Sequence, residues 1–157
     1  MRSLLEVMAE SAEQAVIWAG GLICDRALEG WAVVVWLPEL AATPALEIVG
    51  AQTRVCALDA EMTGAGAPLV RISQAGAPRI QTYVCDVPAS DGPPSEGICL
   101  VSADSAFQHR LSGAARAFKA QALNACGSPA DVGKTEAFRP ADRGWVARPA
   151  VAATPVG

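Results

Sequence analysis

Acidic side chains end three strand-like segments of the sequence, and they are the residues best placed for chemistry. Asp59 ends Cys-Ala-Leu-Asp, Asp86 ends Tyr-Val-Cys-Asp and Asp104 ends Val-Ser-Ala-Asp. Glu61 follows shortly after the first of these segments. Ligands of open α/β sheets bind at the carboxyl ends of the strands, and clustered carboxylates bind Mg²⁺, which handles phosphoryl groups. The four carboxylates predict such a site if the strands run in one direction; otherwise they serve as helix caps or begin turns.

The single histidine, His109, raises the possibility of thiol chemistry. A nucleophilic cysteine needs a nearby base, and Cys99 lies ten residues before it in the chain. Only this nearness in sequence supports the pair, so we favour a surface or capping histidine at the start of a helix. The chain contains no G-x-S-x-G elbow for a serine nucleophile. No catalytic residue is therefore identified, and the sequence favours a protein that is not an enzyme.

Five cysteines are spread along the chain, an odd number that cannot pair completely within one molecule. None forms a C-x-x-C motif, and their spacing matches no zinc signature. Three of them lie in apolar, strand-like segments, where a free cysteine behaves as a small buried hydrophobe. We expect unreactive core thiols at Cys24, Cys56, Cys85, Cys99 and Cys126.

Two glycine-containing segments resemble fragments of nucleotide-binding motifs and fail on spacing. Gly133-Lys-Thr135 looks like the end of a phosphate-binding loop, but Ser128 stands where the motif requires its first glycine. Gly64-Ala-Gly66 is half of a dinucleotide fingerprint, but Pro68 and Leu69 follow where the pattern should continue to its third glycine. We interpret both segments as loops.

Composition bounds the class of protein. The chain has 157 residues, of which 52% are hydrophobic and 18% charged, as expected of one folded domain. Its net charge of −4 argues against nucleic acid or an anionic membrane as the main partner. Residues 1–61 contain nine acidic and three basic residues, whereas the remainder contains seven acidic and nine basic ones. This asymmetry could orient a partner or a second copy of the chain, but we favour the simpler interpretation of a solvated acidic helix face.

Hydrophobic periodicity predicts an α/β fold in a single domain. A capping box at Ser3 and Glu6 and an apolar stripe predict a long N-terminal helix that ends near Gly30, with Gly20-Gly21 marking a kink, a break or a close crossing. Apolar segments predict a parallel core of strands at 31–37, 54–59 and 98–102, with a short helix at 43–50 between the first two. Alternating segments predict an edge hairpin at 68–73 and 79–87, and a second helix is expected at 104–125.

The domain is expected to span residues 1–127, followed by a tail or arm at 128–157 that is rich in proline and alanine. Trp18 on the first helix and Trp145 in the tail are interface candidates if they are exposed, and core residues otherwise. The N-terminus does not resemble a signal peptide, and no segment is long enough to span a bilayer, so we expect a cytoplasmic protein. The sequence favours a non-enzymatic interaction or regulatory domain that self-associates without a cofactor; the alternative is an Mg²⁺-dependent nucleotide- or phosphate-binding protein.

Overall fold

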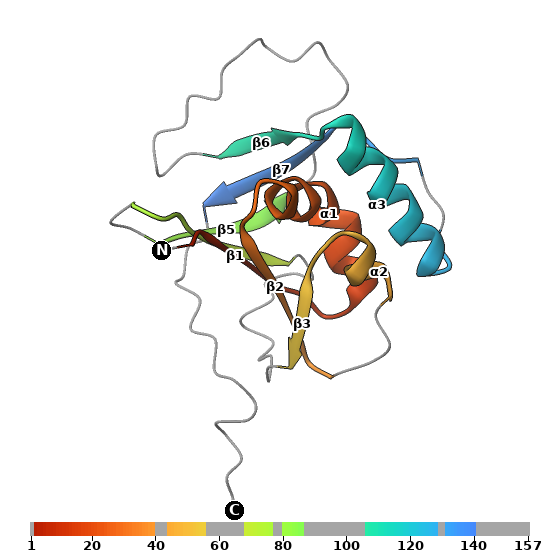
Figure 1. Cartoon of the computed structure of the whole chain (residues 1–157), viewed down its shortest axis with the longest axis horizontal. Helices are drawn as coiled ribbons and strands as arrows, with labels where there is room; N and C mark the ends of the chain where they lie inside the picture. Colours follow the sequence, from red (N-terminus) through yellow and green to blue (C-terminus); the bar gives the residue numbers. More distant parts are fainter. Residues whose placement is uncertain are drawn as a thin grey trace, which may run out of the picture.

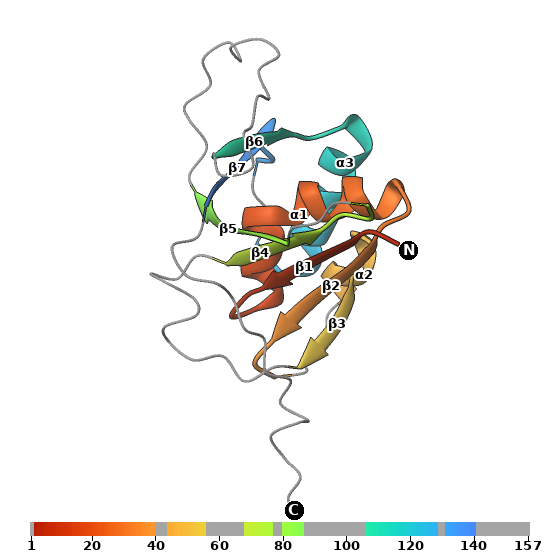
Figure 2. The ribbon, with the colours of Figure 1, turned by 90° about the vertical axis from the view of Figure 1, so that its left-hand side faces the viewer.

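The computed structural model describes residues 2–39, 44–55, 68–76, 80–86, 106–128 and 131–140. Seven strands form one mixed sheet in the order β3-β2-β1-β4-β5-β7-β6, and the described residues also form three helices, which confirms the predicted single-domain α/β class. Figure 2 shows the strands in this order, from β6 and β7 at the top to β3 at the bottom. In chain order the elements are β1 Leu4–Met8, α1 Ala12–Leu28, β2 Ala32–Leu37, α2 Pro44–Ile48, β3 Gln52–Val55, β4 Leu69–Ser73, β5 Gln81–Asp86, β6 Phe107–Arg110, α3 Gly113–Ala125 and β7 Thr135–Pro140.

The first half of the sheet is parallel. β2 is the predicted apolar strand, and it pairs in parallel with β1 on one side and with β3 on the other. The short helix α2 begins at Pro44, as the Thr-Pro signal predicts, and connects β2 to β3. Strand β3 begins two residues before the predicted segment 54–59. Only the first two residues of that segment, Arg54 and Val55, lie in the described part of the chain, and they end β3.

The N-terminal residues form a strand and not the first turns of a helix. β1 is buried on both faces and pairs with β2 and β4, so its five residues join the sheet in spite of the capping-box pattern. Helix α1 begins later, where the Ser11 side chain accepts a hydrogen bond from the backbone N–H of Gln14. The long N-terminal helix therefore exists, but its N-cap is Ser11 in place of Ser3, so it starts eight residues later than the pattern indicates.

The predicted hairpin forms, but it lies inside the sheet. β4 pairs antiparallel with β5, and β4 also pairs with β1 while β5 pairs with β7. The prediction of an edge position is wrong because β7 and β6, which lie beyond β5 in the sheet, were not recognised as strands. β7 lies in the segment predicted as a tail, and β6 occupies part of the predicted helix 104–125, of which only α3 is helical in the described residues. The predicted strand 98–102 lies outside the described residues.

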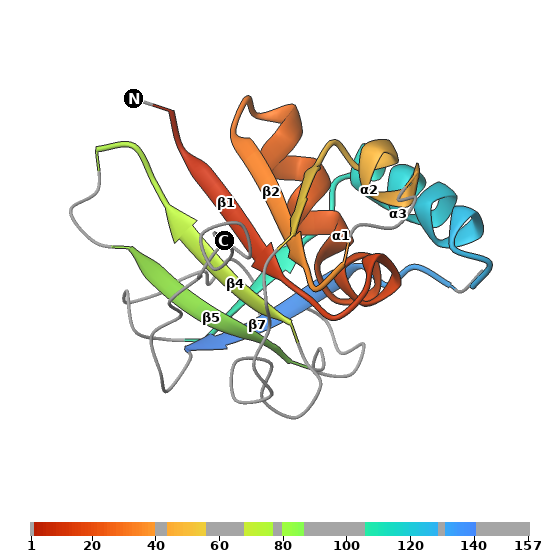
Figure 3. The same cartoon turned by 90° about the horizontal axis from the view of Figure 1, so that it is seen from below.

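All three helices lie on one side of the sheet (Figures 1 and 3). Their apolar side chains share one core with alternate residues of the strands, and the largest of its fully buried side chains include Phe138, Leu5 and Leu22. Helix α3 packs mainly on α1 and α2, outside the layer that covers the strands. Among the described residues no helix has the length and apolar character needed to cross a bilayer.

Candidate functional site

Strand directions decide whether the predicted carboxylates can meet. β5 is antiparallel to β4, which is antiparallel to β1, so β5 runs in the same direction as β1, β2 and β3. Asp86 is the last residue of β5 and therefore stands at the edge where these strands have their carboxyl ends. Asp59, Glu61 and Asp104 lie outside the described residues. Within the described part of the chain no three acidic, cysteine or histidine residues are grouped to hold a metal ion.

The turn from β1 into α1 lies at the same edge, where parallel α/β folds often bind phosphate. It contains no glycine that would let a phosphate approach the backbone, and it carries the carboxylates of Glu10 and Glu13. The Glu10 N–H in this turn is used locally, because it donates to Gln14 Oε1 over 2.8 Å. Glu13 in turn accepts a hydrogen bond from Ser128 Oγ at 2.9 Å. The negative charge at this helix start disfavours an anionic ligand.

His109 forms a polar cluster with residues far away in the sequence. It lies on edge strand β6, and its Nε2 is 2.8 Å from Oδ2 of Asp25 on α1. The backbone N–H of Ser112 donates to the same carboxylate oxygen over 3.1 Å, and the Ser112 hydroxyl donates to the other. Burial alone would raise the pKa of Asp25, but the hydrogen bonds from Ser112 and His109 outweigh it and hold this pKa below its ordinary value.

This cluster contains the residue types of a serine triad in the wrong order. In a triad the imidazole stands between the hydroxyl and the carboxylate. Here the Asp25 carboxylate stands in the middle and accepts from both. Ser112 Oγ also accepts from the Ala115 N–H at 3.0 Å, which makes Ser112 the N-cap of α3. The cluster therefore anchors the start of α3 to α1 and does not activate a nucleophile. The proposed partner Cys99 lies outside the described residues.

A buried ion pair is inserted against the middle of α1. Glu136 on β7 and Lys119 on α3 are 2.7 Å apart, and their side chains are only 3% and 8% exposed. The carboxylate also accepts from the N–H groups of Gly21 and Leu22, each at 2.7 Å. Lys119 Nζ donates to the Ile17 carbonyl at 2.8 Å. In a regular helix the Ile17 carbonyl accepts a hydrogen bond from the N–H of Gly21. The ion pair therefore binds both the acceptor and the donor of one helical hydrogen bond, Lys119 at the carbonyl and Glu136 at the N–H.

The Gly20-Gly21 pair explains how α3, and Leu111 just before it, come this close to α1. A Cβ atom built on Gly21 would lie 2.2 Å from Leu111 Cγ, and one on Gly20 would lie 3.3 Å from Lys119 Cγ. Of the three readings of this pair in the sequence, the structure shows the close crossing.

On the opposite face of the sheet, Glu6 makes a second, smaller polar cluster. Its Oε1 accepts from Arg71 Nε at 2.8 Å and its Oε2 from Trp36 Nε1 at 3.1 Å. These three side chains come from adjacent strands β1, β2 and β4, so the contacts run across the sheet. Glu6 therefore binds Arg71 and Trp36 within the sheet and does not cap a helix, in contrast to the prediction from the sequence pattern.

The thiols in the described residues are unfavourable for nucleophilic chemistry. Burial, reinforced by the charges of Asp25 and Glu136, raises the pKa of Cys24 to about 11. Burial also raises the pKa of Cys85, which is almost fully enclosed, and that of the half-buried Cys126. The prediction of core thiols is confirmed for Cys24 and Cys85. Cys56 and Cys99 lie outside the described residues.

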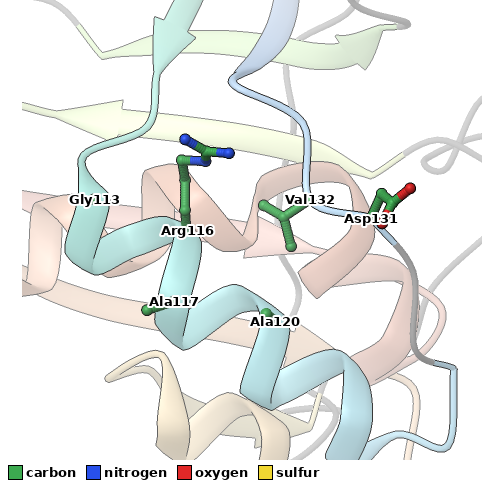
Figure 4. Close-up of a pocket in the computed structure, with 6 residues that line it drawn as sticks. All are labelled: Gly113, Arg116, Ala117, Ala120, Asp131 and Val132. Carbon is green, nitrogen blue, oxygen red and sulfur yellow. The ribbon is translucent and has the colours of Figure 1, made fainter.

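An open groove of about 600 Å³ lies along the outer side of α3 (Figure 4). Arg116 projects from the helix on one wall, and Asp131 projects from the segment that leads into β7 on the other. Its remaining lining is small or apolar and consists of Gly113, Ala117, Ala120 and Val132. The sequence patterns do not single out any of these six residues, because they become neighbours only when β7 joins the sheet.

The interface candidates from the sequence are not brought together. Trp18 is half-buried and packs against the main core, and Trp145 lies outside the described residues. Searches for related family models, curated proteins and solved structures gave no match to this chain.

Proposed function

We propose that this protein is a non-enzymatic interaction or regulatory domain that self-associates and acts in the cytoplasm. The observation that supports this most strongly is the use made of the reactive side-chain types in the described residues. His109 and Ser112 bind Asp25, Lys119 binds Glu136, and both pairs join α1 to its neighbours. A catalytic group must be free to reach a substrate, and these groups are committed to the fold.

Surface composition supports contact with another protein. In the described part of the chain four large apolar side chains are exposed, and three of them, Ile17, Leu28 and Phe118, lie on α1 and α3. Both helices therefore carry exposed apolar surface. Some of the acidic residues in the N-terminal part already have partners within the chain, as Asp25 has in His109. We therefore base self-association on the exposed apolar side chains of α1 and α3, and not on the uneven distribution of charge along the sequence.

Sedimentation equilibrium of the purified chain over a wide concentration series tests this proposal. We expect the apparent mass to rise from one chain toward two as concentration increases. A mass that stays at one chain up to about 1 mM, a concentration at which even weak protein contacts are populated, would rule out self-association.

An Mg²⁺-dependent phosphate- or nucleotide-binding site is the second candidate, because β5 runs parallel to β1–β3 and so places Asp86 at the carboxyl edge. Thermal melting with MgCl₂ and ATP tests it, since a ligand at 100 times its Kd stabilises the fold by about 2.7 kcal/mol. On our first proposal the melting temperature does not respond. A rise that Asp86→Asn abolishes would favour the carboxylate site instead.

A further inference from the structure

The face of the sheet opposite the helices carries buried apolar side chains, although no described helix lies on it (Figures 1 and 3). Successive side chains of a strand point to opposite faces, so the strand residues that alternate with the main core belong to this face. Its buried apolar residues come from five strands and are Met8, Val34, Leu69, Val84 and Ala137. Met8 is 0% exposed, and none of the others exceeds 8%. A sheet face that is open to water carries mainly polar side chains, so this face needs a cover from elsewhere in the chain.

Met8 lies in the middle of a row of side chains that crosses this face. The pairing register places side by side, on the neighbouring strands β3, β2, β1, β4 and β5, the residues Arg54, Trp36, Met8, Leu69 and Val84. The strands β1, β2 and β3 all have their carboxyl ends just beyond this row. The cover must therefore reach the carboxyl edge of the parallel half of the sheet.

The connection from β3 to β4 begins and ends in this row. Its residues 56–67 lie outside the described part of the chain. It leaves β3 after Val55, which follows Arg54, and returns at Pro68, which precedes Leu69. Its two ends are three strand spacings apart, about 14 Å, and Met8 lies between them. Twelve residues can extend to about 40 Å, so this connection is long enough to fold across the face and back.

The helical side of the sheet is already occupied at this edge. Helix α1 follows β1 and α2 follows β2, so the chain turns twice from this edge toward the helical side, where α1 packs on both strands. Connections at one edge of a sheet do not cross each other. The β3–β4 connection avoids such a crossing if it passes on the helix-free side.

The composition of this connection suits the face. It contains two large apolar residues, Leu58 and Met62, which could cover the apolar row. It also contains two acidic residues, Asp59 and Glu61, and the exposed guanidinium of Arg54 stands on this face at the point where the connection begins. Both the apolar and the charged groups therefore have complements on the sheet.

We propose that residues 56–67 cover the helix-free face of the sheet, with their apolar side chains against the row centred on Met8. The other long segments outside the described residues, 87–105 and 141–157, adjoin the row only at its far end, because they follow Asp86 on β5 and Pro140 on β7. This inference goes beyond the function proposed above. It assigns the helix-free face to the chain itself and leaves the helices as the surface for a second copy.

Oxidation of Met8 by hydrogen peroxide, followed by peptide mass spectrometry, tests the proposal in the full-length chain. Peroxide forms the sulfoxide only where it reaches the thioether, so Met8 should react far more slowly in the native chain than in urea. Replacing both Leu58→Ser and Met62→Ser should accelerate the reaction at least about tenfold, because a weakened cover opens more often.

Matched control variants make equivalent changes in the two other segments. Leu100→Ser with Val101→Ser alters 87–105, and Trp145→Ser with Val146→Ser alters 141–157. Neither pair should change the oxidation rate of Met8. Circular dichroism melting verifies that each variant is folded under the conditions of the reaction.

Photo-crosslinking tests the contact in a chain without substitutions that could impair folding. Photo-methionine takes the place of the methionines at positions 1, 8 and 62, and on illumination its diazirine loses N₂ and the carbene inserts into a neighbouring bond. Position 62 should become linked to the tryptic peptide 3–26, which contains Met8, or to the peptide 27–54, which contains Trp36. The same treatment in urea is the control and should give neither link.

The possible outcomes are distinct. Rapid oxidation of Met8 in the native chain would mean that the face is open, and the proposal would be wrong. It would also be wrong if only the changes in 87–105 or 141–157 exposed Met8, or if position 62 became linked to other parts of the chain. If the Leu58 and Met62 variant does not fold, the crosslink decides. None of these results affects self-association, which the concentration series tests separately.

Discussion

Glu136 offers the sharpest test of how this fold is stabilised. Its carboxylate receives three hydrogen bonds, from Lys119 and from two N–H groups in the middle of α1, in a place where its side chain is 3% exposed. Glu136→Gln keeps the shape but leaves one acceptor oxygen in place of two. The new NH₂ group must then face a donor, either the ammonium of Lys119 or an amide of α1.

The expected loss of unfolding free energy depends on the buried charge that remains without a partner. Removing one partner of a buried ion pair typically costs about 3–5 kcal/mol, because the other charge stays buried without compensation. A domain of ordinary stability has about 5–15 kcal/mol in total, so Glu136→Gln should remain folded but lose a large fraction of its free energy of unfolding. Lys119→Met should cost a similar amount, since it leaves the carboxylate without its cation and the Ile17 carbonyl without its donor.

Urea unfolding followed by circular dichroism measures the loss of unfolding free energy in both variants. A lower midpoint with an unchanged slope of free energy against urea concentration shows a loss of stability. Glu29→Gln is the matched control, because Glu29 pairs with Arg26 at the same 2.7 Å distance but is 54% exposed. An exposed pair of this kind contributes about 0–1 kcal/mol. The two buried substitutions should also be coupled by at least about 1 kcal/mol in a double-mutant cycle. If Glu136→Gln costs no more than Glu29→Gln, the buried pair is not the junction we describe.

Three further substitutions or treatments have defined outcomes. Gly21→Ala should destabilise the protein by about 1–3 kcal/mol in urea unfolding, because its Cβ would lie 2.2 Å from Leu111 Cγ; an unchanged midpoint would contradict the close crossing. The folded-state pKa of Asp25 lies below its ordinary value of 3.8, so its stabilising effect is present above that pH and is lost as the pH falls through the folded-state pKa. Asp25→Asn should therefore flatten the stability profile measured between pH 5 and pH 2, and an equally steep profile would argue against the cluster. Iodoacetamide labelling followed by peptide mass spectrometry should modify Cys24 and Cys85 only as fast as the protein unfolds, and fast labelling of the native state would show that their burial is incomplete.

Signals that act over short stretches of sequence predicted several elements well. The β-branched run before Leu37 forms β2, and the Thr-Pro pair gives the start of α2. These elements follow from the chain's own local preferences, which tertiary contacts reinforce.

Elements that depend on distant partners were misjudged. The Ser3 and Glu6 pattern suits a helix cap, yet Glu6 is satisfied by Arg71 and Trp36, which join it only when the sheet forms. Sheet pairing then outweighs the local helical signal in β1.

The C-terminal half shows the same effect. The segment around β7 was predicted as a tail from its composition, rich in proline and alanine. The partners of Glu136, namely Lys119 and the α1 amides, are invisible in the local pattern. The second helix was predicted to start at residue 104, whereas Ser112, also a good N-cap residue type, caps α3 at its start at Gly113. Because β6 and β7 were not predicted as strands, the predicted hairpin had no neighbour beyond β5 and was placed at the edge of the sheet.

Of the predicted carboxylate site, only Asp86 can be placed, and it was placed correctly on its strand end. The clusters that the structure reveals, Asp25 with His109 and Lys119 with Glu136, join residues 84 and 17 positions apart. No spacing rule links such residues, because the contacts depend on the path of the backbone and not on the distance along the chain.

The position of β7 has a consequence for biosynthesis. It fills the gap between β5 and β6, although it is made after both of them, and it delivers Glu136 to the centre of α1. A nascent chain that has not yet released residues 135–140 from the ribosome leaves β5 with an open hydrogen-bonding edge and β6 without a neighbour among the described strands. Such an unfinished sheet is prone to pair with other chains. Ribosomes that stall before this point should thus yield aggregation-prone fragments, while those that pass it release a chain able to close its own sheet.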